Sequence, residues 1–222
     1  MDYRLLKILE EETAREKAKK KKKPIFKLRK EKSVMYYSGW HKTQAKKIIL
    51  IDGGPASGKT TLGKLLVENF NSQGEKSILL DLDSYVEEFC PKWVWDNNKQ
   101  KEMDLFNARE NFIKAINKYL QKNSAVIAIG ERFLIGEDVN RYMCKLAPGS
   151  SVYLYHLSVP IMVRGARLEQ RGHHTVIDLD KDQRERDKIE HWLGYVYRNI
   201  NSPEVDASNL MQLVNDGIGL IN

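Results

Sequence analysis

The chain has 222 residues, of which 41% are hydrophobic and 30% charged. This length allows one α/β domain with an extension, and no apolar run approaches the ~20 residues that a membrane span requires. No apolar segment follows the first charged residues, so a secretory signal is not expected. The two cysteines, Cys90 and Cys144, are far apart and lack metal-ligand spacing. We therefore expect reduced thiols in a cytoplasmic protein with no membrane partner.

The positive charge is concentrated at the N-terminus. Residues 1–47 contain 16 Lys/Arg and 6 Asp/Glu, whereas the remaining residues contain 21 and 24, so the net charge of +7 comes from the extension. We predict a basic arm over residues 1–45, beginning with an amphipathic helix from Tyr3 that stops before Pro24. Such an arm is either a solvated tail or a contact for nucleic-acid phosphates.

Residues 53–60, Gly-Gly-Pro-Ala-Ser-Gly-Lys-Thr, fit the phosphate-binding pattern G-x-x-x-x-G-K-[ST]. An apolar run over 47–51 precedes the motif and helical periodicity over 61–70 follows it, which predicts a strand, a Gly-rich turn and a helix. Lys59 is expected to reach the β- and γ-phosphates, and the Thr60 hydroxyl to bind Mg²⁺. The predicted nucleotide-binding residues are Gly53, Gly54, Pro55, Ala56, Ser57, Gly58, Lys59, Thr60 and Thr61. The motif predicts binding of a nucleoside triphosphate.

The remaining pattern alternates strands with helices. We predict strands over 76–81, 125–129 and 152–155, and helices over 102–121, 160–170 and 184–197. A short strand over 203–206 and a closing helix from residue 208 complete the domain. This alternation favours a parallel sheet with right-handed crossovers.

Charged residues follow two of the predicted strands. Asp81 and Asp83 end the second strand, where carboxylates face the ligand crevice of a parallel sheet and can take a proton from an acceptor hydroxyl or assist the metal. The alternative is that they only cap the helix that starts at Ser84. Glu131 and Arg132 follow the third strand, where Glu131 can organise Mg²⁺ and Arg132 can hold a phosphate or the acceptor. An ordinary surface pair is the alternative there.

Arginines and tryptophans form a further group of candidates. Arg164, Arg167 and Arg171 are spaced i, i+3, i+7 and lie on one helix stripe, which predicts a lid over 164–186 that stabilises the transferring phosphoryl group. A solvated basic face has the same spacing. Arg109 lies in the middle of the long helix, and Trp93 is predicted either to stack on an acceptor base or to fill the core.

Together these residues resemble the thymidylate kinase and deoxynucleoside kinase group of P-loop kinases, over about residues 46–220. The resemblance implies a three-layer P-loop NTPase fold with a five-stranded parallel sheet, a kinase domain over 46–222, and often a homodimer. It also implies substrate-binding roles for Arg109 and Arg132. One departure is the acidic run Asp81-Leu82-Asp83-Ser84-Tyr85, where thymidylate kinases carry an arginine-containing phosphate grip. An acidic group suits an acceptor hydroxyl that must lose a proton.

The sequence thus predicts an enzyme that uses Mg²⁺ and ATP to phosphorylate a nucleoside or nucleotide. The predicted catalytic residues are Lys59, Asp81, Asp83, Glu131, Arg164, Arg167 and Arg171. The predicted metal-binding residues are Thr60, Asp83 and Glu131, and the predicted substrate-binding residues are Arg109, Arg132 and Trp93. Two alternatives stay open: a kinase of DNA or RNA hydroxyls that uses the basic arm, and a nucleotide-binding regulator with little catalysis.

Overall fold

The computed structural model describes residues 46–171 and 178–221. The chain divides into the units Met1–His41 and Lys42–Asn222, and the described residues all belong to the second. The predicted basic arm over 1–45, with its helix, and the 172–177 part of the predicted lid lie outside these residues.

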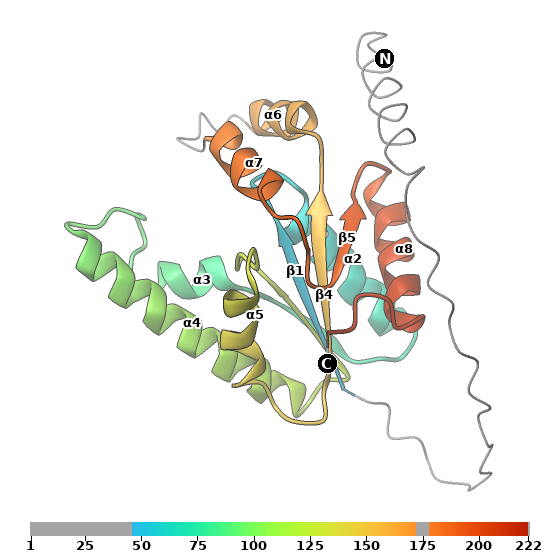
Figure 1. Cartoon of the computed structure of the whole chain (residues 1–222). Coiled ribbons are helices and arrows are strands. Elements are labelled where there is room, and N and C mark those ends of the chain that lie inside the picture. The colour runs from blue at the N-terminus through green and yellow to red at the C-terminus, as the bar shows by residue number, and fades with distance from the viewer. Residues whose placement is uncertain (1–45, 172–177, 222) are drawn as a thin grey trace, which may run out of the picture. The chain divides into compact units, whose positions relative to one another are not determined.

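A five-stranded parallel sheet forms the centre of the described unit (Figure 1). Its order is β2-β3-β1-β4-β5, so the strand carrying the phosphate-binding motif is central. The bounds are β1 Lys47–Gly53, β2 Ser77–Asp81, β3 Ala125–Ile129, β4 Ser151–Ser158 and β5 Tyr195–Arg198. The predicted α/β class with a five-stranded parallel sheet is confirmed.

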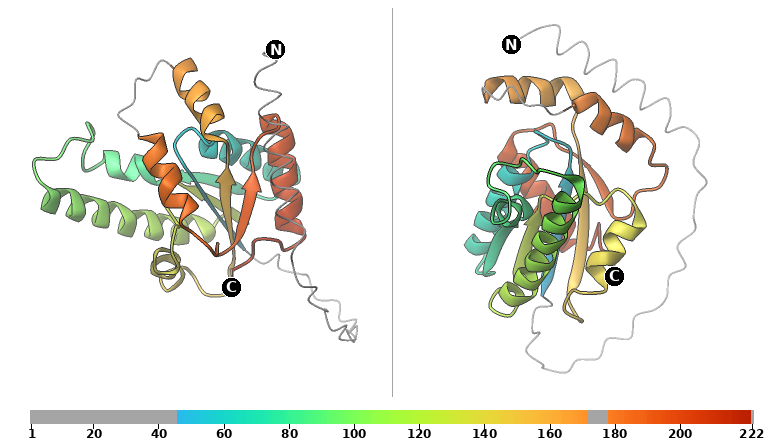
Figure 2. Two further views of the ribbon diagram at one scale, coloured as in Figure 1. Left: turned by 45° about the horizontal axis from the view of Figure 1, so that its top comes forward. Right: turned by 90° about the vertical axis from the view of Figure 1, so that its left-hand side faces the viewer.

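Helices cover both faces of the sheet and form three layers with it. The helices α2, Lys59–Ser72, and α8, Pro203–Asn215, pack on one face, and α4, Asn98–Leu120, and α5, Gly136–Met143, pack on the other. The short α3, Leu82–Glu87, follows β2 directly. The pair α6, Ile161–Gln170, and α7, Leu179–Asp187, lies above the carboxyl ends of the strands (Figures 1 and 2). No described helix is long and apolar enough to cross a membrane.

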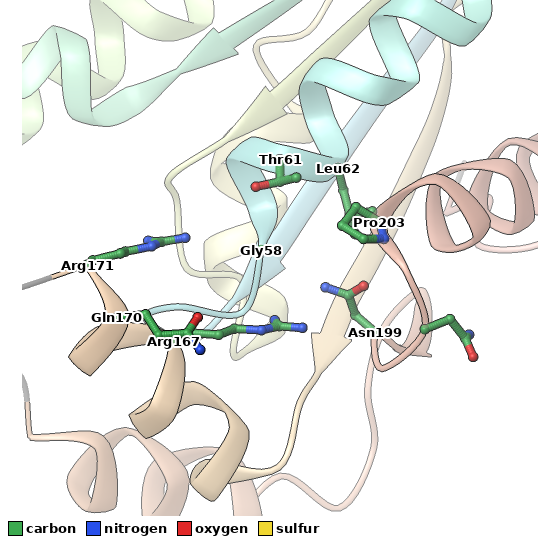
Figure 3. A pocket seen from close by; sticks show the side chains of 9 residues that line it. Gly58, Thr61, Leu62, Arg167, Gln170, Arg171, Asn199 and Pro203 are labelled. Atoms are coloured by element: carbon green, nitrogen blue, oxygen red, sulfur yellow. The ribbon is translucent and has the colours of Figure 1, made fainter. Parts of the chain in front are cut away.

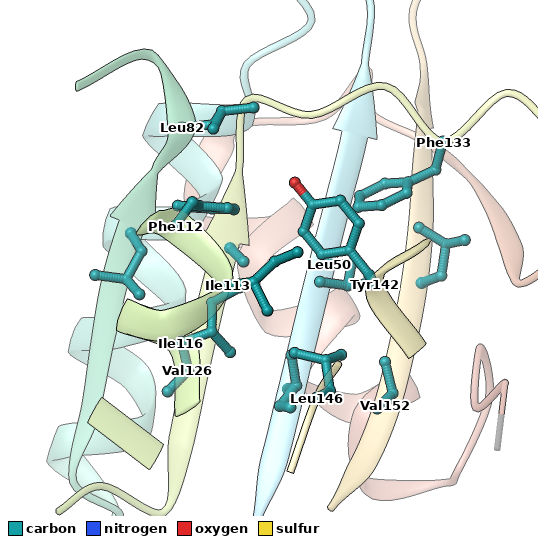
Figure 4. Packing of buried hydrophobic residues seen from close by; sticks show 14 of the residues in the cluster. Leu50, Leu82, Phe112, Ile113, Ile116, Val126, Phe133, Tyr142, Leu146 and Val152 are labelled. Atoms are coloured by element: carbon teal, nitrogen blue, oxygen red, sulfur yellow. The ribbon is translucent and has the colours of Figure 1, made fainter. Parts of the chain in front are cut away.

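The alternation of side chains along β1 explains the two cores. Ile48 and Leu50 point to the α4 and α5 face, whereas Ile49 and Ile51 point to α2 and α8. All four are fully buried, as expected for a central strand of a parallel sheet. Figure 4 shows the first core, in which Phe112 and Ile116, one helical turn apart, pack towards the sheet.

The C-terminal quarter differs from the prediction. The helix predicted over 184–197 is instead the end of α7 followed by β5, and Gly194 separates them with a φ of 86°. A Cβ at Gly194 would collide with the Leu154 carbonyl of β4, so only glycine fits where the chain joins the sheet. The strand predicted over 203–206 is the first turn of α8. Proline at the first position and the Ser202 side chain, which accepts from the Val205 amide, start that helix.

Candidate active site

The loop between β1 and α2 has the geometry of an anion cradle. Gly58 is the residue before α2, with a φ of 95° and no side-chain cap on the helix. Ala56 also has a left-handed backbone, with a φ of 57°. Alternating left-handed and ordinary conformations turn successive N–H groups inward, and the first N–H groups of α2 have no partner within their own helix. The buried hydroxyl of Ser57 has no hydrogen-bond partner among the described residues, so the loop fits a phosphate.

Lys59 lies folded against its own loop. Its Nζ donates to the carbonyl oxygens of Gly53 at 2.7 Å and Gly54 at 3.2 Å. Burial lowers the pKa of Lys59, and the nearby carboxylates of Asp52 and Asp83 oppose that shift. The amine is therefore held where phosphate oxygens can replace the two carbonyls.

A cavity of about 680 Å³ opens above the phosphate-binding loop. It is bounded by the loop, by the ends of β2 and β3, and by α6 and α7. The sequence-predicted residues that line it are Gly53, Pro55, Ala56, Ser57, Gly58, Lys59, Thr60, Thr61, Asp81, Asp83, Glu131, Arg132 and Arg171. The structure therefore brings most of the predicted site together.

Asp81 and Asp83 differ in their contacts: Asp81 caps a helix, whereas the side chain of Asp83 has no capping bond. Asp81 Oδ1 accepts from the Asp83 amide at 3.1 Å and so caps α3, which begins at Leu82 rather than at Ser84. The Asp83 side chain opens on the cavity. Partial burial of the Asp83 carboxyl group and then the negative charge of Asp81 raise the pKa of Asp83 to about 6. The positive charge of Lys59 opposes this shift. A carboxylate with a pKa close to neutral is suited to proton transfer.

The side chains of Arg109 and Tyr142 hold the Glu131 carboxylate by hydrogen bonds. Arg109 donates to it through Nε at 2.6 Å and Nη2 at 3.2 Å, and the Tyr142 hydroxyl donates at 2.9 Å. Burial would lower the pKa of Arg109, but the bonds and charge of Glu131 outweigh burial and raise it. Arg109 lines a separate cavity of about 300 Å³ with Phe106 and is not among the residues lining the large one. Arg109 is therefore connected to the large cavity through its hydrogen bonds to Glu131.

Asp182 of α7 joins three of the arginines. Its carboxylate accepts from Arg164 Nη1 at 2.7 Å, Arg132 Nη2 at 3.3 Å and Arg186 Nε at 3.3 Å. Arg164 is only 2% exposed and does not line the large cavity. The predicted stripe therefore splits, because Arg164 ties α6 to α7 while the other two arginines face the phosphate-binding loop.

Arg167 and Arg171 lie beside that loop. Arg167 Nη1 donates to the Ala56 carbonyl at 3.3 Å. Burial and then the charge of Arg171 lower the pKa of Arg167. The two arginines repel one another in the absence of an anion, so a polyphosphate between them would relieve that repulsion.

A smaller cavity of about 230 Å³ adjoins the loop (Figure 3). Figure 3 shows Arg167 and Arg171 from the end of α6 on one side and Asn199 and Pro203 on the other. Asn199, the residue directly after β5, donates through Nδ2 to the Ser57 carbonyl at 2.6 Å and so supports the loop. A guanidinium plane beside an amide suits a nucleotide base, which adjoins the phosphates of the same molecule.

Sequence reasoning missed a buried network under the phosphate-binding loop. Asp52 accepts from Arg186 at 2.9 and 3.0 Å and contacts His156 Nδ1 at 2.9 Å. Burial alone would raise the pKa of Asp52, but the bonds from His156 and Arg186 outweigh it and hold the pKa well below its usual range. A signal was present, because Asp52 and His156 are charged or polar residues in otherwise apolar strands, and the register pairs them.

Trp93 lies apart from these residues. It is 42% exposed, makes an edge contact with Trp95 at 6.0 Å, and is not among the residues that line the large cavity. Trp95 is partly buried, and its indole N–H donates to Asp104 at 3.0 Å.

A comparison with known protein families gives one match, the shikimate kinase model, over residues 55–216. The chain belongs to the shikimate kinase family. It is therefore an ATP-dependent kinase of the P-loop class, as the sequence predicted, with Mg²⁺ as the expected metal. The matched family is not the thymidylate kinase and deoxynucleoside kinase group that the sequence resembled, so membership in that group is not supported. No curated protein matches the chain.

Solved structures share the fold of this shikimate kinase family member at low identity. A shikimate kinase from Aquifex aeolicus is 17% identical with a TM-score of 0.51, covering 76% of this chain and 96% of that one. A tunicamycin resistance protein from Deinococcus radiodurans is 15% identical with a TM-score of 0.54, covering 80% and 99%. An APS kinase from Mycobacterium tuberculosis, solved with AMPPNP and APS, is 12% identical with a TM-score of 0.55, covering 77% and 98%.

Proposed function

We propose that the protein transfers the γ-phosphoryl group of ATP to a hydroxyl of a small molecule, with Asp83 as the general base. The observation that carries the proposal is the position of Asp83, which lines the same cavity as Lys59 and Thr60 and has a pKa raised to about 6. A base in that position can accept the hydroxyl proton as the oxygen attacks phosphorus.

The other roles follow from where the residues lie. Lys59, Arg167 and Arg171 would bind the phosphates and stabilise the charge that develops during transfer. Thr60 with Asp81 would hold Mg²⁺ together with phosphate oxygens, since Mg²⁺ usually takes only one or two carboxylates from the protein, and Asp83 then stays available as the base. The metal neutralises phosphate charge and orients the γ-phosphoryl group.

Three predicted residues take different roles in this proposal. Glu131, bound by Arg109 and Tyr142, would contact Mg²⁺ through water and shape the acceptor side together with Arg132. Arg164 would act through Asp182, as a positioning residue for α7. Trp93 would contribute only if the acceptor extends beyond the cavity.

A nucleoside is the acceptor that we expect from the sequence resemblance, and it carries the hydroxyl that an acidic site requires. The second candidate is a terminal hydroxyl of DNA or RNA, which the charge of residues 1–47 favours. That arm lies outside the described residues. The homodimer implied by the resemblance also stays a prediction, and light scattering after size exclusion would test it.

Label transfer from γ-labelled ATP tests the proposal. Purified protein with Mg²⁺ would be incubated with four acceptor pools: nucleosides, nucleoside monophosphates, small hydroxy acids such as shikimate, and oligonucleotides. Label on a small acceptor, absent with Lys59→Ala, is the expected result. Label on oligonucleotides alone would favour the second candidate. No transfer to any pool, with ATP bound, would contradict the proposal and favour a nucleotide-binding regulator.

A further inference from the structure

A buried histidine of β4 takes no part in the proposed chemistry. His156 is 2% exposed, and its Nδ1 lies 2.9 Å from Asp52 Oδ2 of β1. Its Nε2 lies 2.8 Å from the carbonyl oxygen of Leu193, in the connection that runs from α7 to β5. The ring therefore joins the strand that leads into the phosphate-binding loop to the segment that leaves α7.

Neither of these two partners has a proton to donate. A backbone carbonyl oxygen offers only lone pairs. Burial would raise the pKa of Asp52, but the bonds from His156 and from Arg186, the latter at 2.9 and 3.0 Å, hold that pKa well below its usual range, so Asp52 is ionised. A bare ring nitrogen facing either oxygen would set lone pair against lone pair at hydrogen-bond distance. Both nitrogens of His156 must donate to satisfy these contacts.

The ring lines a small cavity that opens on solvent. This cavity, of about 280 Å³, is also lined by Trp192 and by the exposed residues Ser158 and Val196. Water can therefore reach the histidine and exchange its protons. The Trp192 ring lies with its centroid 4.4 Å from that of His156, at an interplanar angle of 53°. The electron-rich face of an indole attracts a cation, so this contact favours a charged histidine.

Charged groups of both signs surround the ring, and the two direct bonds decide its protonation. The described charged groups that interact with Asp52 or Arg186, or that line the small cavity, are the carboxylates of Asp52, Asp182 and Asp187 and the cations Lys59, Arg164 and Arg186. β5 contributes the uncharged Val196, which pairs with His156 in the sheet register. Three carboxylates face three cations, so these surroundings do not exclude a proton from the ring.

We infer that His156 is protonated on both ring nitrogens at neutral pH and acts as a pH-sensitive link between the phosphate-binding strand β1 and the end of α7. Loss of one proton leaves a single N–H for two acceptors. The bond to Asp52 is then retained, because a hydrogen bond to a charged acceptor is stronger than one to a carbonyl. The bond to Leu193 is lost, and the segment after α7, whose Arg186 lines the large cavity, is released at that point. The link is therefore closed at lower pH and opens as the pH rises.

NMR of the wild-type protein tests the number of ring protons directly. With ¹⁵N-labelled histidine at pH 7, the signals of His156 should show a proton on each ring nitrogen, and the spectrum of His156→Gln assigns them among the five histidines. A His156 ring with one bare nitrogen at pH 7 would overturn the inference. The experiment uses the full chain and no acceptor, so its result is independent of the proposed phosphoryl transfer.

Amide hydrogen exchange measures the link itself. The protection of residues 195–198, corrected for the intrinsic pH dependence of exchange, should fall about tenfold in the wild type between pH 6 and pH 9. His156→Asn places an amide N–H near the position of Nδ1 and so imitates the singly protonated ring. This variant should show the low protection at both pH values. His191→Asn, which changes an exposed histidine of the same connection, should behave as the wild type.

His156→Gln completes the comparison. Its amide N–H lies near the position of Nε2 and can donate to Leu193 at every pH. Protection in this variant should stay constant between pH 6 and pH 9 and exceed that of His156→Asn. Wild-type protection that does not change with pH, or a change of the same size in His156→Asn, would contradict the link. The wild-type NMR and exchange measurements decide the inference even where a variant does not fold.

Discussion

Two aspartates on either side of the phosphate-binding loop have opposite environments. Asp52, directly before the loop, is fully buried and bonded by Arg186 and His156. Asp83, in the first turn of α3 directly after β2, is open to the cavity, and its side chain forms no ion pair with another described residue. The pKa of the first is held well below the usual range, while the pKa of the second is raised to about 6.

The difference suits one aspartate to structural support of the loop and the other to proton transfer. A carboxylate bonded by the Arg186 guanidinium and the His156 ring fixes the strands and helices that meet beneath the loop, and it stays ionised. A carboxylate left among other carboxylates holds its proton more tightly and can exchange it near neutral pH. We therefore assign positioning to Asp52 and proton transfer to Asp83.

The largest expected effect on activity comes from Asp83→Asn. Without the base, the single-turnover rate of phosphoryl transfer should fall by about 10²- to 10⁴-fold. The affinity for ATP and the urea midpoint should be retained, because the carboxylate has no stabilising partner to lose. Glu88→Gln, directly after the same short helix and outside the cavity, serves as the control and should leave the rate within about twofold. A rate in Asp83→Asn equal to that of the wild type would remove Asp83 from the chemistry.

Asp52→Asn should give the largest loss of stability. Arg186 would keep its largely buried position without a counter-charge, which costs about 3–5 kcal/mol of the free energy of unfolding. Urea denaturation at pH 7 measures the loss, with the exposed Asp96→Asn as the matched control. An Asp52→Asn protein as stable as the wild type would mean that the network carries no net stability.

The sign of the pH dependence gives a second test at Asp52. Its pKa is lowered in the folded state, so its contribution is complete above pH ~4, the ordinary range of an aspartate, and is lost as the pH falls towards the folded pKa. The difference in stability between wild type and Asp52→Asn should therefore shrink on acidification below pH ~4.

Particular residues show how much of the candidate site the sequence could predict. The motif at 53–60 located the loop between β1 and α2. The pattern of carboxylates after apolar strands placed Asp83 and Glu131 at the cavity, because parallel strands end at one edge of the sheet. The pattern could not show which ion pairs form. Arg164 has the same helical spacing as Arg167, yet it is buried against Asp182, a residue 18 positions later whose direction only tertiary packing sets.

The C-terminal elements were misassigned for a similar reason. Charged and aromatic residues mixed over 184–197 do not reveal that the chain must leave α7 and join the edge of the sheet as β5. Asp52 and His156 were detectable as single polar residues in apolar strands, but their pairing depends on the register of β1 with β4.

Tyr142→Phe should have a smaller effect. The Tyr142 hydroxyl donates to Glu131 at 2.9 Å in a buried position, and a hydrogen bond to a charged group is worth about 1.5–3 kcal/mol. We expect a loss of stability in that range and a fall in kcat of less than tenfold, since Arg109 still holds Glu131. Thermal unfolding and steady-state rates measure both, with Tyr153→Phe, on the sheet, as the control. A fall in kcat as large as that of Asp83→Asn would place Glu131 at the centre of the chemistry.

The pH dependence of the wild-type rate gives a test of Asp83 that needs no substitution. With the pKa of Asp83 raised to about 6 by burial and by Asp81, kcat/KM should rise with pH, about tenfold per unit below pH 6, and level off above it. A profile that is flat between pH 5 and pH 8 would contradict the assignment of Asp83 as base.

The most direct test of the proposed chemistry follows the γ-phosphate itself. Protein loaded with γ-labelled ATP and Mg²⁺ would be mixed with uridine and 5-aminomethyluridine, and the label divided between acceptor and inorganic phosphate would be counted over a single turnover. We predict that acceptor accelerates ATP consumption and that the label appears on the acceptor. ATP consumption that acceptors do not change, with all label in inorganic phosphate, would contradict a kinase acting on a hydroxyl of a small molecule.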